Sequence, residues 1–342
     1  MLNRYKNSDD ALIIAEVGQN HQGDIEIARK YIKEFASAGA DVIKFQTRDN
    51  KSLFSSCAYN KPYNSENAFA EIYGLHREKL ELPIESLELL KRDCHQNGVL
   101  FMSTSFDEPS LERLVEVGVD ILKVASFDIG NLPFLKKIAE QNIPTVLSIG
   151  GGKIDQIRSS IELVRESCDE VAVLHCVSEY PCYYNKLGLN NLDTLRREFP
   201  QCVIGLSDHF NGIVSGPVAY MKGARIFEKH VTFDRSWRGT DHSFALTLHG
   251  FKNFVRDIRR VPGMMVPKNE NELGKEFVFQ KLGKSLVARY DLRAGDTLNI
   301  DNMSSKICNQ QHIPVRESNL VMGKKIIKDV RAGEFIARGN ID

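Results

Sequence analysis

The sequence has no surplus of charge of either sign and no long hydrophobic run. Its 342 residues contain 45 Lys plus Arg and 45 Asp plus Glu. No broad positive surface is therefore available to neutralise a polyanion, and we expect no nucleic-acid partner. The longest N-terminal apolar stretch runs from Ala11 to Ala15 and ends at Glu16. That is too short for a signal-peptide core or a membrane span, so we expect a cytoplasmic protein without membrane contact.

Cysteine is scarce and is not arranged in pairs. The seven cysteines are an odd set without a CxxC spacing, which argues against a disulfide framework and a thiolate zinc site. We expect reduced, mostly buried thiols. Phosphate-binding loops for nucleotides are also missing: the glycines at 150–152 lack the upstream glycine, and Val278 stands where the GKS at 283–285 needs one. ATP binding is not supported.

What is present is the composition of a soluble globular protein with two domains. Apolar residues make up 42% of the chain and charged residues 26%, which excludes disorder, collagen and a simple coiled coil. The length allows one large domain of about 250 residues and a small one.

Short apolar runs recur along the first three quarters of the chain. Each is rich in Val, Ile or Leu with little alternation, which is typical of strands buried on both faces of a parallel sheet. The eight runs cover residues 11–16, 41–46, 98–104, 119–126, 143–150, 170–176, 202–209 and 224–230.

Helical patterns lie between these runs. Residues 25–39 carry an apolar stripe after the candidate N-cap Asp24, and Pro83, Pro109 and Pro133 mark the first turns of other helices. Eight strands that alternate with helices predict a (β/α)8 TIM barrel, because each parallel crossover needs a helix. A doubly wound open sheet is the competing architecture.

The interval between the second and third runs is about twice as long as most others. The excess spans roughly residues 52–82, and an insertion after a barrel strand commonly builds or covers the active site. The alternative is that the insertion only packs against the barrel and has no catalytic role.

The last part of the chain does not continue the alternation of strand and helix patterns. We predict a catalytic barrel over residues 1–265, a polar linker over 266–281 and a small domain over 282–342. Two stretches of the small domain, 282–295 and 322–333, echo each other and both end in Arg-Ala-Gly. We expect a compact, mostly irregular β domain with little core of its own.

Two histidines at strand ends are candidate metal ligands. His209 and His230 close neighbouring runs, and the carboxyl ends of barrel strands meet at one rim. Two imidazoles can share a divalent cation and leave positions for water and substrate. Hydrogen-bonded histidines without a metal are the alternative. His21, His175 and His242 are weaker candidates.

Lys44 and Lys123 also end strand runs and suit a phosphate or carboxylate ligand. There are two alternatives: one of the lysines is a Schiff-base nucleophile, or both lysines form ordinary ion pairs. Hydroxyl groups expected at the same rim belong to Thr104, Ser126, Ser148 and Ser207.

Three carboxylates complete the rim. Glu16, Glu228 and Asp241 lie at or beyond strand ends, where they could bind sugar hydroxyls, orient an aldehyde or move a proton. The alternative is that they only pair with neighbouring lysines.

Six motifs occur together and in order. They are IIAEVGQNHQGD at 13–24, KFQT at 44–47, KVAS at 123–126, GLSDH at 205–209, EKH at 228–230 and GTDHSFAL at 239–246. This set resembles the sialic acid (N-acetylneuraminate) synthase family. The resemblance covers nearly the whole chain, since the C-terminal segment is similar to the SAF, or type III antifreeze-like, β-clip domain.

The resemblance implies a transferase that condenses phosphoenolpyruvate with an N-acetylmannosamine-type aldose. The products would be N-acetylneuraminate or its 9-phosphate, and phosphate, with Mn²⁺ or Mg²⁺ as cofactor. By motif, His209 and His230 match the metal ligands. Glu16, Glu228 and Lys123 match catalytic positions; Lys44, Thr104, Lys123, Ser126, Ser148 and Ser207 match phosphoenolpyruvate contacts; Gln46, Phe106, Tyr180 and Asp241 match the sugar site.

The chain departs from the family pattern in the tail. Many bacterial members have Arg-Pro-Gly where residues 306–309 read Lys-Ile-Cys-Asn, so no arginine stands at Ile307, and Ser178 replaces a common asparagine. The inserted region and residues 235–243 look more like animal-type members, which act on the 6-phosphorylated sugar. The acceptor alternatives are free or 6-phosphorylated N-acetylmannosamine, mannose 6-phosphate, or a diamino sugar.

The resemblance further implies a homodimer in which each tail covers the partner's barrel. Two rival functions remain at this point. One is another phosphoenolpyruvate-dependent aldose synthase that makes a seven- or eight-carbon product, although such enzymes lack this tail. The other is a non-catalytic carbohydrate-binding or ice-binding protein whose barrel has lost its activity.

Overall fold

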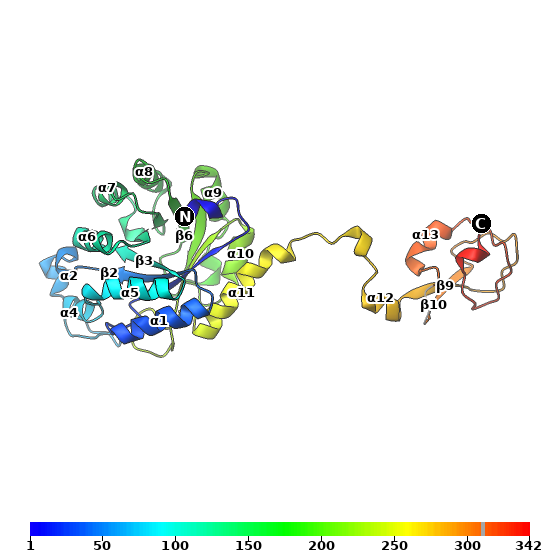
Figure 1. Ribbon diagram of the computed structural model, residues 1–342, viewed down its shortest axis with the longest axis horizontal. Helices are drawn as coiled ribbons and strands as arrows, with labels where there is room; N and C mark the ends of the chain where they lie inside the picture. The colour runs from blue at the N-terminus through cyan, green and yellow to red at the C-terminus, as the bar shows by residue number, and fades with distance from the viewer. Residues whose placement is uncertain (309–311) are drawn as a thin grey trace. The chain divides into compact units, whose positions relative to one another are not determined.

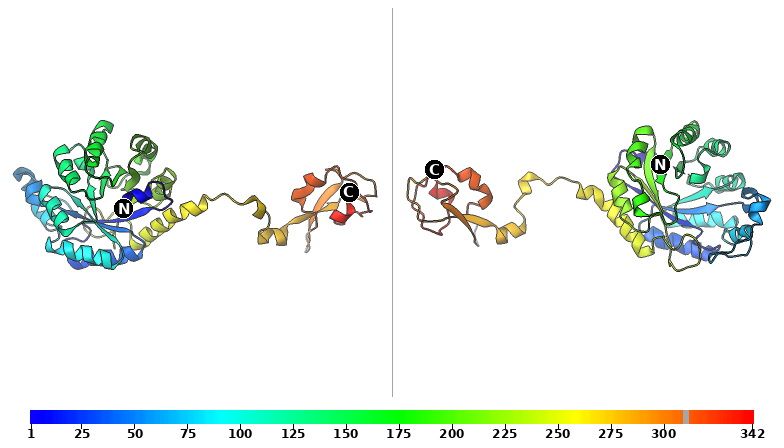
Figure 2. Two further views of the ribbon diagram at one scale, coloured as in Figure 1. Left: turned by 45° about the horizontal axis from the view of Figure 1, so that its top comes forward. Right: turned by 180° about the vertical axis from the view of Figure 1, so that it is seen from behind.

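The computed structural model describes residues 1–308 and 312–342 and divides into two compact units, Met1–Met265 and Val266–Asp342. Asn309, the last residue of the departing tail motif, lies outside the described residues. Each unit is described by itself, and Figures 1 and 2 show both.

The first unit is a closed barrel of eight parallel strands with helices around it (Figure 1). The prediction of a (β/α)8 barrel is confirmed, and the open doubly wound sheet is wrong, because β1 pairs with β8 as well as with β2. The strands are β1 (Leu12–Gly18), β2 (Val42–Thr47), β3 (Leu100–Ser105), β4 (Ile121–Val124), β5 (Thr145–Ser148), β6 (Val171–Cys176), β7 (Val203–Asp208) and β8 (Ile226–His230).

Eight longer helices surround the barrel. The N-cap prediction for the first is confirmed, since the Asp24 carboxylate accepts the N–H groups of Glu26 and Ile27. Pro109 and Pro133 lie in first helical turns, whereas Pro83 precedes its helix. The helices are α1 (Ile25–Ser37), α5 (Glu85–Gln96), α6 (Glu108–Val117), α7 (Leu132–Glu140), α8 (Ile154–Arg165), α9 (Asn191–Glu198), α10 (Ser215–Met221) and α11 (Leu248–Met264).

The insertion after β2 forms three short helices, α2 (Asn50–Leu53), α3 (Ser56–Tyr59) and α4 (Tyr73–Glu78). Single turns of 3-10 helix, η1 (Leu2–Tyr5), η2 (Ser126–Asp128) and η3 (Tyr184–Lys186), complete the unit.

Two hydrophobic layers hold the barrel together. The outer layer packs the helices against the strands. The inner layer fills the barrel with alternate strand residues and is joined by Leu2 and Tyr5 of η1 at the ends where the strands begin. At the opposite end, where the strands finish, polar side chains line the barrel.

Glycine is needed where β7 packs on β8. A Cβ built on Gly205 would lie 2.3 Å from the carbonyl oxygen of Ile226 and 2.5 Å from a methyl group of Leu174. Both neighbours are inside the barrel wall, so a side chain at Gly205 would push the strands apart. The close approach sets the spacing of the two strands that lead to His209 and His230.

The second unit has a hydrophobic cluster of its own, larger than the sequence led us to expect, which includes Leu286, Leu298, Ile313 and Ile336. Its one sheet among the described residues pairs β9 (Lys284–Ala288) with β10 (Met303–Ile307) in antiparallel fashion. The remaining elements are η4 (Glu270–Glu272), α12 (Phe277–Leu282), η5 (Val315–Glu317), α13 (Ser318–Val321) and η6 (Arg338–Asn340).

The two echoing stretches of the tail pair with each other. Leu292 and Val330 exchange both backbone hydrogen bonds, at 2.8 and 2.9 Å. Gly295 and Gly333, which end the two Arg-Ala-Gly turns, have φ of 99° and 80°, a region that favours glycine. The internal repeat is therefore a pair of similar turns.

Nearly all of the segment 263–282 is exposed, and it includes η4 and α12 in the stretch where the sequence predicts a linker. Five of the seven cysteines are buried free thiols, namely Cys94, Cys168, Cys176, Cys182 and Cys202. Within the described residues, we find no helix whose length and apolar character would suit a bilayer crossing.

Candidate active site

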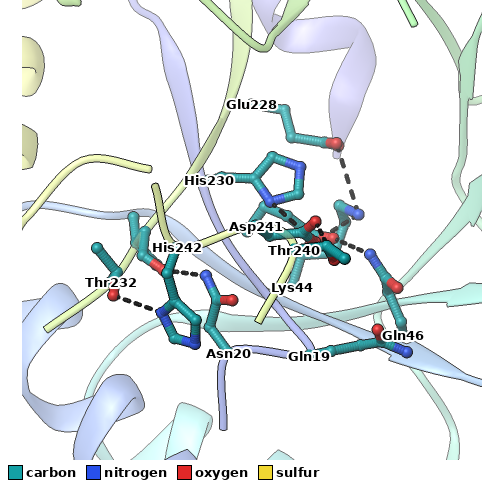
Figure 3. Close-up of polar contacts among 12 residues, drawn as sticks. Gln19, Asn20, Lys44, Gln46, Glu228, His230, Thr232, Thr240, Asp241 and His242 are labelled. Carbon is teal, nitrogen blue, oxygen red and sulfur yellow. Dashed lines mark hydrogen bonds and ion pairs between the residues drawn. The ribbon is translucent and has the colours of Figure 1, made fainter. Parts of the chain in front are cut away.

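The strand ends bring the predicted site residues to one mouth of the barrel, and Figure 3 shows Lys44, Gln46, Glu228, His230 and Asp241 among them. In the register of the sheet, Glu16 of β1 lies beside Lys44 of β2 on one side and His230 of β8 on the other. Thr104 of β3 lies between Gln46 and Lys123, and Ser207 of β7 lies beside Glu228. Residues far apart in the sequence thus become neighbours because the barrel closes.

Two lysines and two glutamates form a buried charged cluster. The Lys44 ammonium lies 2.7 Å from Glu16 and 3.5 Å from Glu228, and the Lys123 ammonium lies 4.0 Å from Glu228. None of these side chains is more than 5% exposed. The cluster is therefore electrically balanced in the absence of a ligand.

Burial and pairing move the pKa values of this cluster in different directions. Burial opposes the charge of Lys44, but Glu16 and Glu228 raise its pKa. Burial lowers the pKa of Lys123, whose neighbour Lys44 adds repulsion. Burial raises the pKa of Glu16, whereas the two lysines hold the pKa of Glu228 low against the effect of burial. Glu16 is consequently the carboxyl group better suited to take up a proton.

The predicted hydroxyl groups lie at this mouth, and one of them makes no hydrogen bond within the described residues. Lys44 donates to the Thr104 hydroxyl at 3.2 Å, and Ser207 donates to Glu228 at 3.2 Å. The Ser126 hydroxyl accepts the N–H of Gly150 at 2.9 Å. The buried hydroxyl of Ser148 has no hydrogen-bond partner among the described residues, so it is available to a ligand.

His209 and His230 face each other across neighbouring strands. Their ring centroids are 5.3 Å apart with an interplanar angle of 55°. Nδ1 of His209 donates to the carbonyl of Val177 at 2.8 Å, which leaves Nε2 with a lone pair. Nδ1 of His230 is buried without a hydrogen bond in the described chain, 3.6 Å from the Asp241 carboxylate.

These donors fit a divalent cation with an open coordination sphere. Among the described residues, no group of three or more His, Cys, Asp or Glu is arranged to hold a metal ion. A cation would therefore take His209 and His230 as ligands and complete its shell with water or substrate oxygens. The carbonyl contact of His209 orients its ring as an outer hydrogen bond does in metal sites.

The weaker histidine candidates make local hydrogen bonds instead. His175 bonds to the carbonyl of Leu187 at 2.6 Å, and His242 bonds to the Thr232 hydroxyl at 2.8 Å. Nδ1 of His21 accepts the N–H of Gly23 at 3.1 Å. Each of them holds backbone or loop structure near the mouth.

The predicted sugar-site residues form a second group beside the charged cluster. Gln46 donates to Glu16 at 2.7 Å. The Tyr180 ring lies 4.1 Å from that of His209, and its side chain is half exposed. The ring of Phe106 lies under the guanidinium of Arg48 at 3.9 Å. Tyr180 thus lies beside the imidazoles, whereas Gln46 lies beside Glu16 and Phe106 beside Arg48.

Sequence reasoning missed several residues of the mouth. Phe244 is buried with its ring 5.1 Å from His230, and it lies inside the motif at 239–246 that we had noted. The Cys176 thiol lies 4.0 Å from Nδ1 of His209. Arg48 could have been found from strand alternation, because residues 44, 46 and 48 share one face of β2 and its continuation.

Comparisons with known proteins identify the family of the chain. The model of the NeuB family matches residues 31–269. The N-acetylneuraminate-9-phosphate synthase of Mus musculus is 31% identical over 331 residues, which cover 96% of this chain and 92% of that protein. The N,N'-diacetyllegionaminic acid synthase of Campylobacter jejuni is 33% identical over 302 residues, covering 86% of this chain and 90% of that protein.

A solved structure is similar as well. The sialic acid synthetase of Leptospira borgpetersenii, determined with citrate, has a TM-score of 0.69 and 30% identity and covers 78% of this chain and 90% of its own. On the match of the family model and of nearly full-length relatives, the chain belongs to the NeuB family.

Proposed function

We propose that the protein condenses phosphoenolpyruvate with N-acetylmannosamine or its 6-phosphate to give N-acetylneuraminate or its 9-phosphate, and phosphate. The observation that carries this proposal is the buried cluster of Lys44, Lys123, Glu16 and Glu228 at the same mouth as the paired imidazoles. The relatives named for such products support the same reaction class.

The lysines and hydroxyls would bind phosphoenolpyruvate. Its phosphate and carboxylate meet Lys44, Lys123 and the unpaired hydroxyl of Ser148, which is chemistry suited to an anion in a dry site. The two ammonium groups that would face this anion are already buried in place before it binds.

The carbon–carbon bond would form between the enol carbon and the aldehyde carbon of the sugar. A divalent cation on His209 and His230, Mn²⁺ or Mg²⁺, would supply Lewis acidity to the aldehyde oxygen. Glu16, whose pKa burial raises, would accept a proton from water that adds to the former enol carbon. Cleavage of the carbon–oxygen bond then releases phosphate and leaves the 2-keto acid. Of the two protons of the added water, one ends on the former aldehyde oxygen, which becomes a hydroxyl, and the other leaves with phosphate.

A second candidate is a synthase that uses a diamino sugar, supported by the similarity to the legionaminic acid synthase. Mannose 6-phosphate is a further acceptor to be tested. A non-catalytic carbohydrate-binding protein would have no use for a buried pair of lysines beside two carboxylates, so the charged cluster argues against it.

We also propose the homodimer with exchanged tails as the assembly. The second unit exposes large apolar side chains, among them Phe277 at 77% exposure, which a partner could cover.

The deciding experiment measures phosphate release from phosphoenolpyruvate with free N-acetylmannosamine, its 6-phosphate, mannose 6-phosphate and a diamino sugar in turn. We expect release only when an aldose and a divalent cation are both present, with a nine-carbon keto acid formed in equal amount. His209→Ala and His230→Ala should abolish turnover without loss of fold by circular dichroism. Release without any aldose, or full activity of these variants in a chelator, would refute the proposal.

A further inference from the structure

Two arginines meet beside the sugar site and are not used by the charged cluster. Arg48 follows the end of β2 by one residue, and Arg77 lies in α4 of the insertion. The insertion therefore contributes a cation to the mouth of the barrel.

Arg48 is held in place on three sides. Its side chain is only 7% exposed and lies 3.2 Å from Glu81. The guanidinium stacks on Phe106 at 3.9 Å and donates to the side-chain oxygen of Gln46. Such a group is oriented before any ligand arrives, which lowers the entropy cost of binding.

Arg77 has hydrogen-bonding capacity that the protein does not use. It donates to the side-chain oxygen of Gln19 at 2.9 Å. In the part of the chain that the structure describes, its buried Nε has no partner, the buried amide nitrogen of Gln19 has none either, and no carboxylate lies within 4.0 Å of the guanidinium. Two buried donors without acceptors at one place point to an acceptor that a ligand brings.

The two guanidinium groups give this corner a positive charge. Burial and the neighbouring charge of Arg77 lower the pKa of Arg48 to about 10, so the arginines are close enough to repel. Glu81 is the carboxylate within 4.0 Å of Arg48, and burial raises its pKa in spite of both arginines. Among the described residues, the two guanidinium groups therefore share a single ion-pair partner.

This corner adjoins the acceptor side of the mouth. Gln46 donates to Glu16 at 2.7 Å with its nitrogen and accepts from Arg48 with its oxygen, so it lies between the charged cluster and the arginines. Asp241, which lies 3.6 Å from His230, also interacts electrostatically with Arg48. Figure 3 shows the Gln19 side chain running toward that of Gln46.

We propose that Arg48, Arg77 and Gln19 form an anion subsite that binds a phosphate on the acceptor sugar, at the end remote from the aldehyde. The inference rests on the proposed function and selects the phosphorylated acceptor within it. It gives the insertion after β2 a role in specificity, since Arg77 reaches the mouth only because α4 packs there. The opposing view is that the arginines merely fasten the insertion to the barrel.

The test compares kcat/KM for N-acetylmannosamine 6-phosphate and for free N-acetylmannosamine, both at saturating phosphoenolpyruvate. We expect the wild type to prefer the phosphorylated sugar. Arg77→Gln should lower the ratio of the two kcat/KM values by about 10-fold to 100-fold, the effect of losing one hydrogen bond to a charged group. Arg77→Lys, which keeps the charge, should restore part of the ratio.

Arg225→Gln is the matched control. Arg225 is partly buried, as Arg77 is, but it precedes β8 at the end of the barrel where the strands begin. This variant should keep the wild-type ratio. Thermal unfolding of each variant shows whether folding is intact.

The outcomes separate the subsite from the reaction. An unchanged ratio in folded Arg77→Gln, or a wild type that prefers the free sugar, overturns the subsite and leaves the condensation standing. No aldose-dependent phosphate release with either sugar overturns the condensation itself. Calorimetric titration with N-acetylmannosamine 6-phosphate in the absence of phosphoenolpyruvate adds a readout without turnover, and Arg77→Gln should weaken that binding by the same factor.

Discussion

Burial decides the protonation of individual histidines near the mouth. His21 is 1% exposed, and burial lowers its pKa from 6.5 to about 4. Its Nδ1 accepts the N–H of Gly23, a hydrogen bond that only the neutral ring can accept. The unfolded chain binds a proton at this residue below about pH 6.5, whereas the folded chain does not until about pH 4.

The sign of the effect follows from that difference. Above about pH 6.5 His21 is neutral in both the folded and the unfolded chain. As the pH falls from 6.5 toward 4, only the unfolded chain gains a proton at His21, so the free energy of unfolding decreases. We expect the loss to reach at most about 3 kcal/mol, the equivalent of the pKa difference. Urea unfolding at pH 7 and pH 5 measures it, with His21→Gln as the comparison. Equal losses of stability in the wild type and in His21→Gln between these pH values would contradict the assignment.

At the scale of elements, the pairing of β7 with β8 positions the two imidazoles. Asp208 and Lys229 are the residues immediately before His209 and His230, and they are neighbours in the sheet. Their charged atoms are 2.6 Å apart, and neither side chain is more than 1% exposed. The buried ion pair therefore ties together the ends of the strands that carry the histidines.

Breaking this pair should be costly. Lys229→Met leaves Asp208 charged and buried, and we expect a loss of about 3–5 kcal/mol in the free energy of unfolding. The double variant with Asp208→Asn should recover part of that loss. Urea unfolding of both single variants and the double variant gives the coupling energy.

Lys137 provides the matched control. It pairs with Glu108, but both side chains are about half exposed, so Lys137→Met should cost no more than about 1 kcal/mol. A similar small loss for Lys229→Met would show that the buried pair does not stabilise β7 against β8.

The sequence allowed the barrel and the strand-end residues to be predicted because both depend on local patterns. Runs of buried Val, Ile and Leu marked the strands, and a strand end identifies the rim in any closed barrel. The contact between Arg77 and Gln19 could not be predicted in this way, since it depends on how the insertion packs on residues that are distant in the sequence. The larger core of the tail was underestimated because its apolar residues are scattered over turns rather than gathered in runs.

At the scale of the whole molecule, two units with separate cores are joined by the exposed segment 263–282. Exposed backbone with few contacts is the preferred place for protease cleavage. Lys268 and Lys275 lie in this segment and are exposed.

Brief trypsin treatment should therefore cut first at Lys268 or Lys275, as peptide masses will show. We expect the released barrel fragment to unfold cooperatively. If the tails are exchanged in a dimer, cleavage should also turn a dimer into separate barrels in sedimentation velocity. First cuts inside the barrel, or a dimer that survives complete cleavage of the segment, would contradict the respective expectation.

The joining of β1 to β8 has a consequence for how the chain is made. Glu16 and Lys44 leave the ribosome early, whereas Glu228 and His230, which complete their surroundings, are added only near the end of the barrel. At about 5–20 residues per second, the nascent chain spends many seconds as an open sheet with carboxylates and ammonium groups still in water. The pocket can therefore close only after Glu228 and His230 have been synthesised.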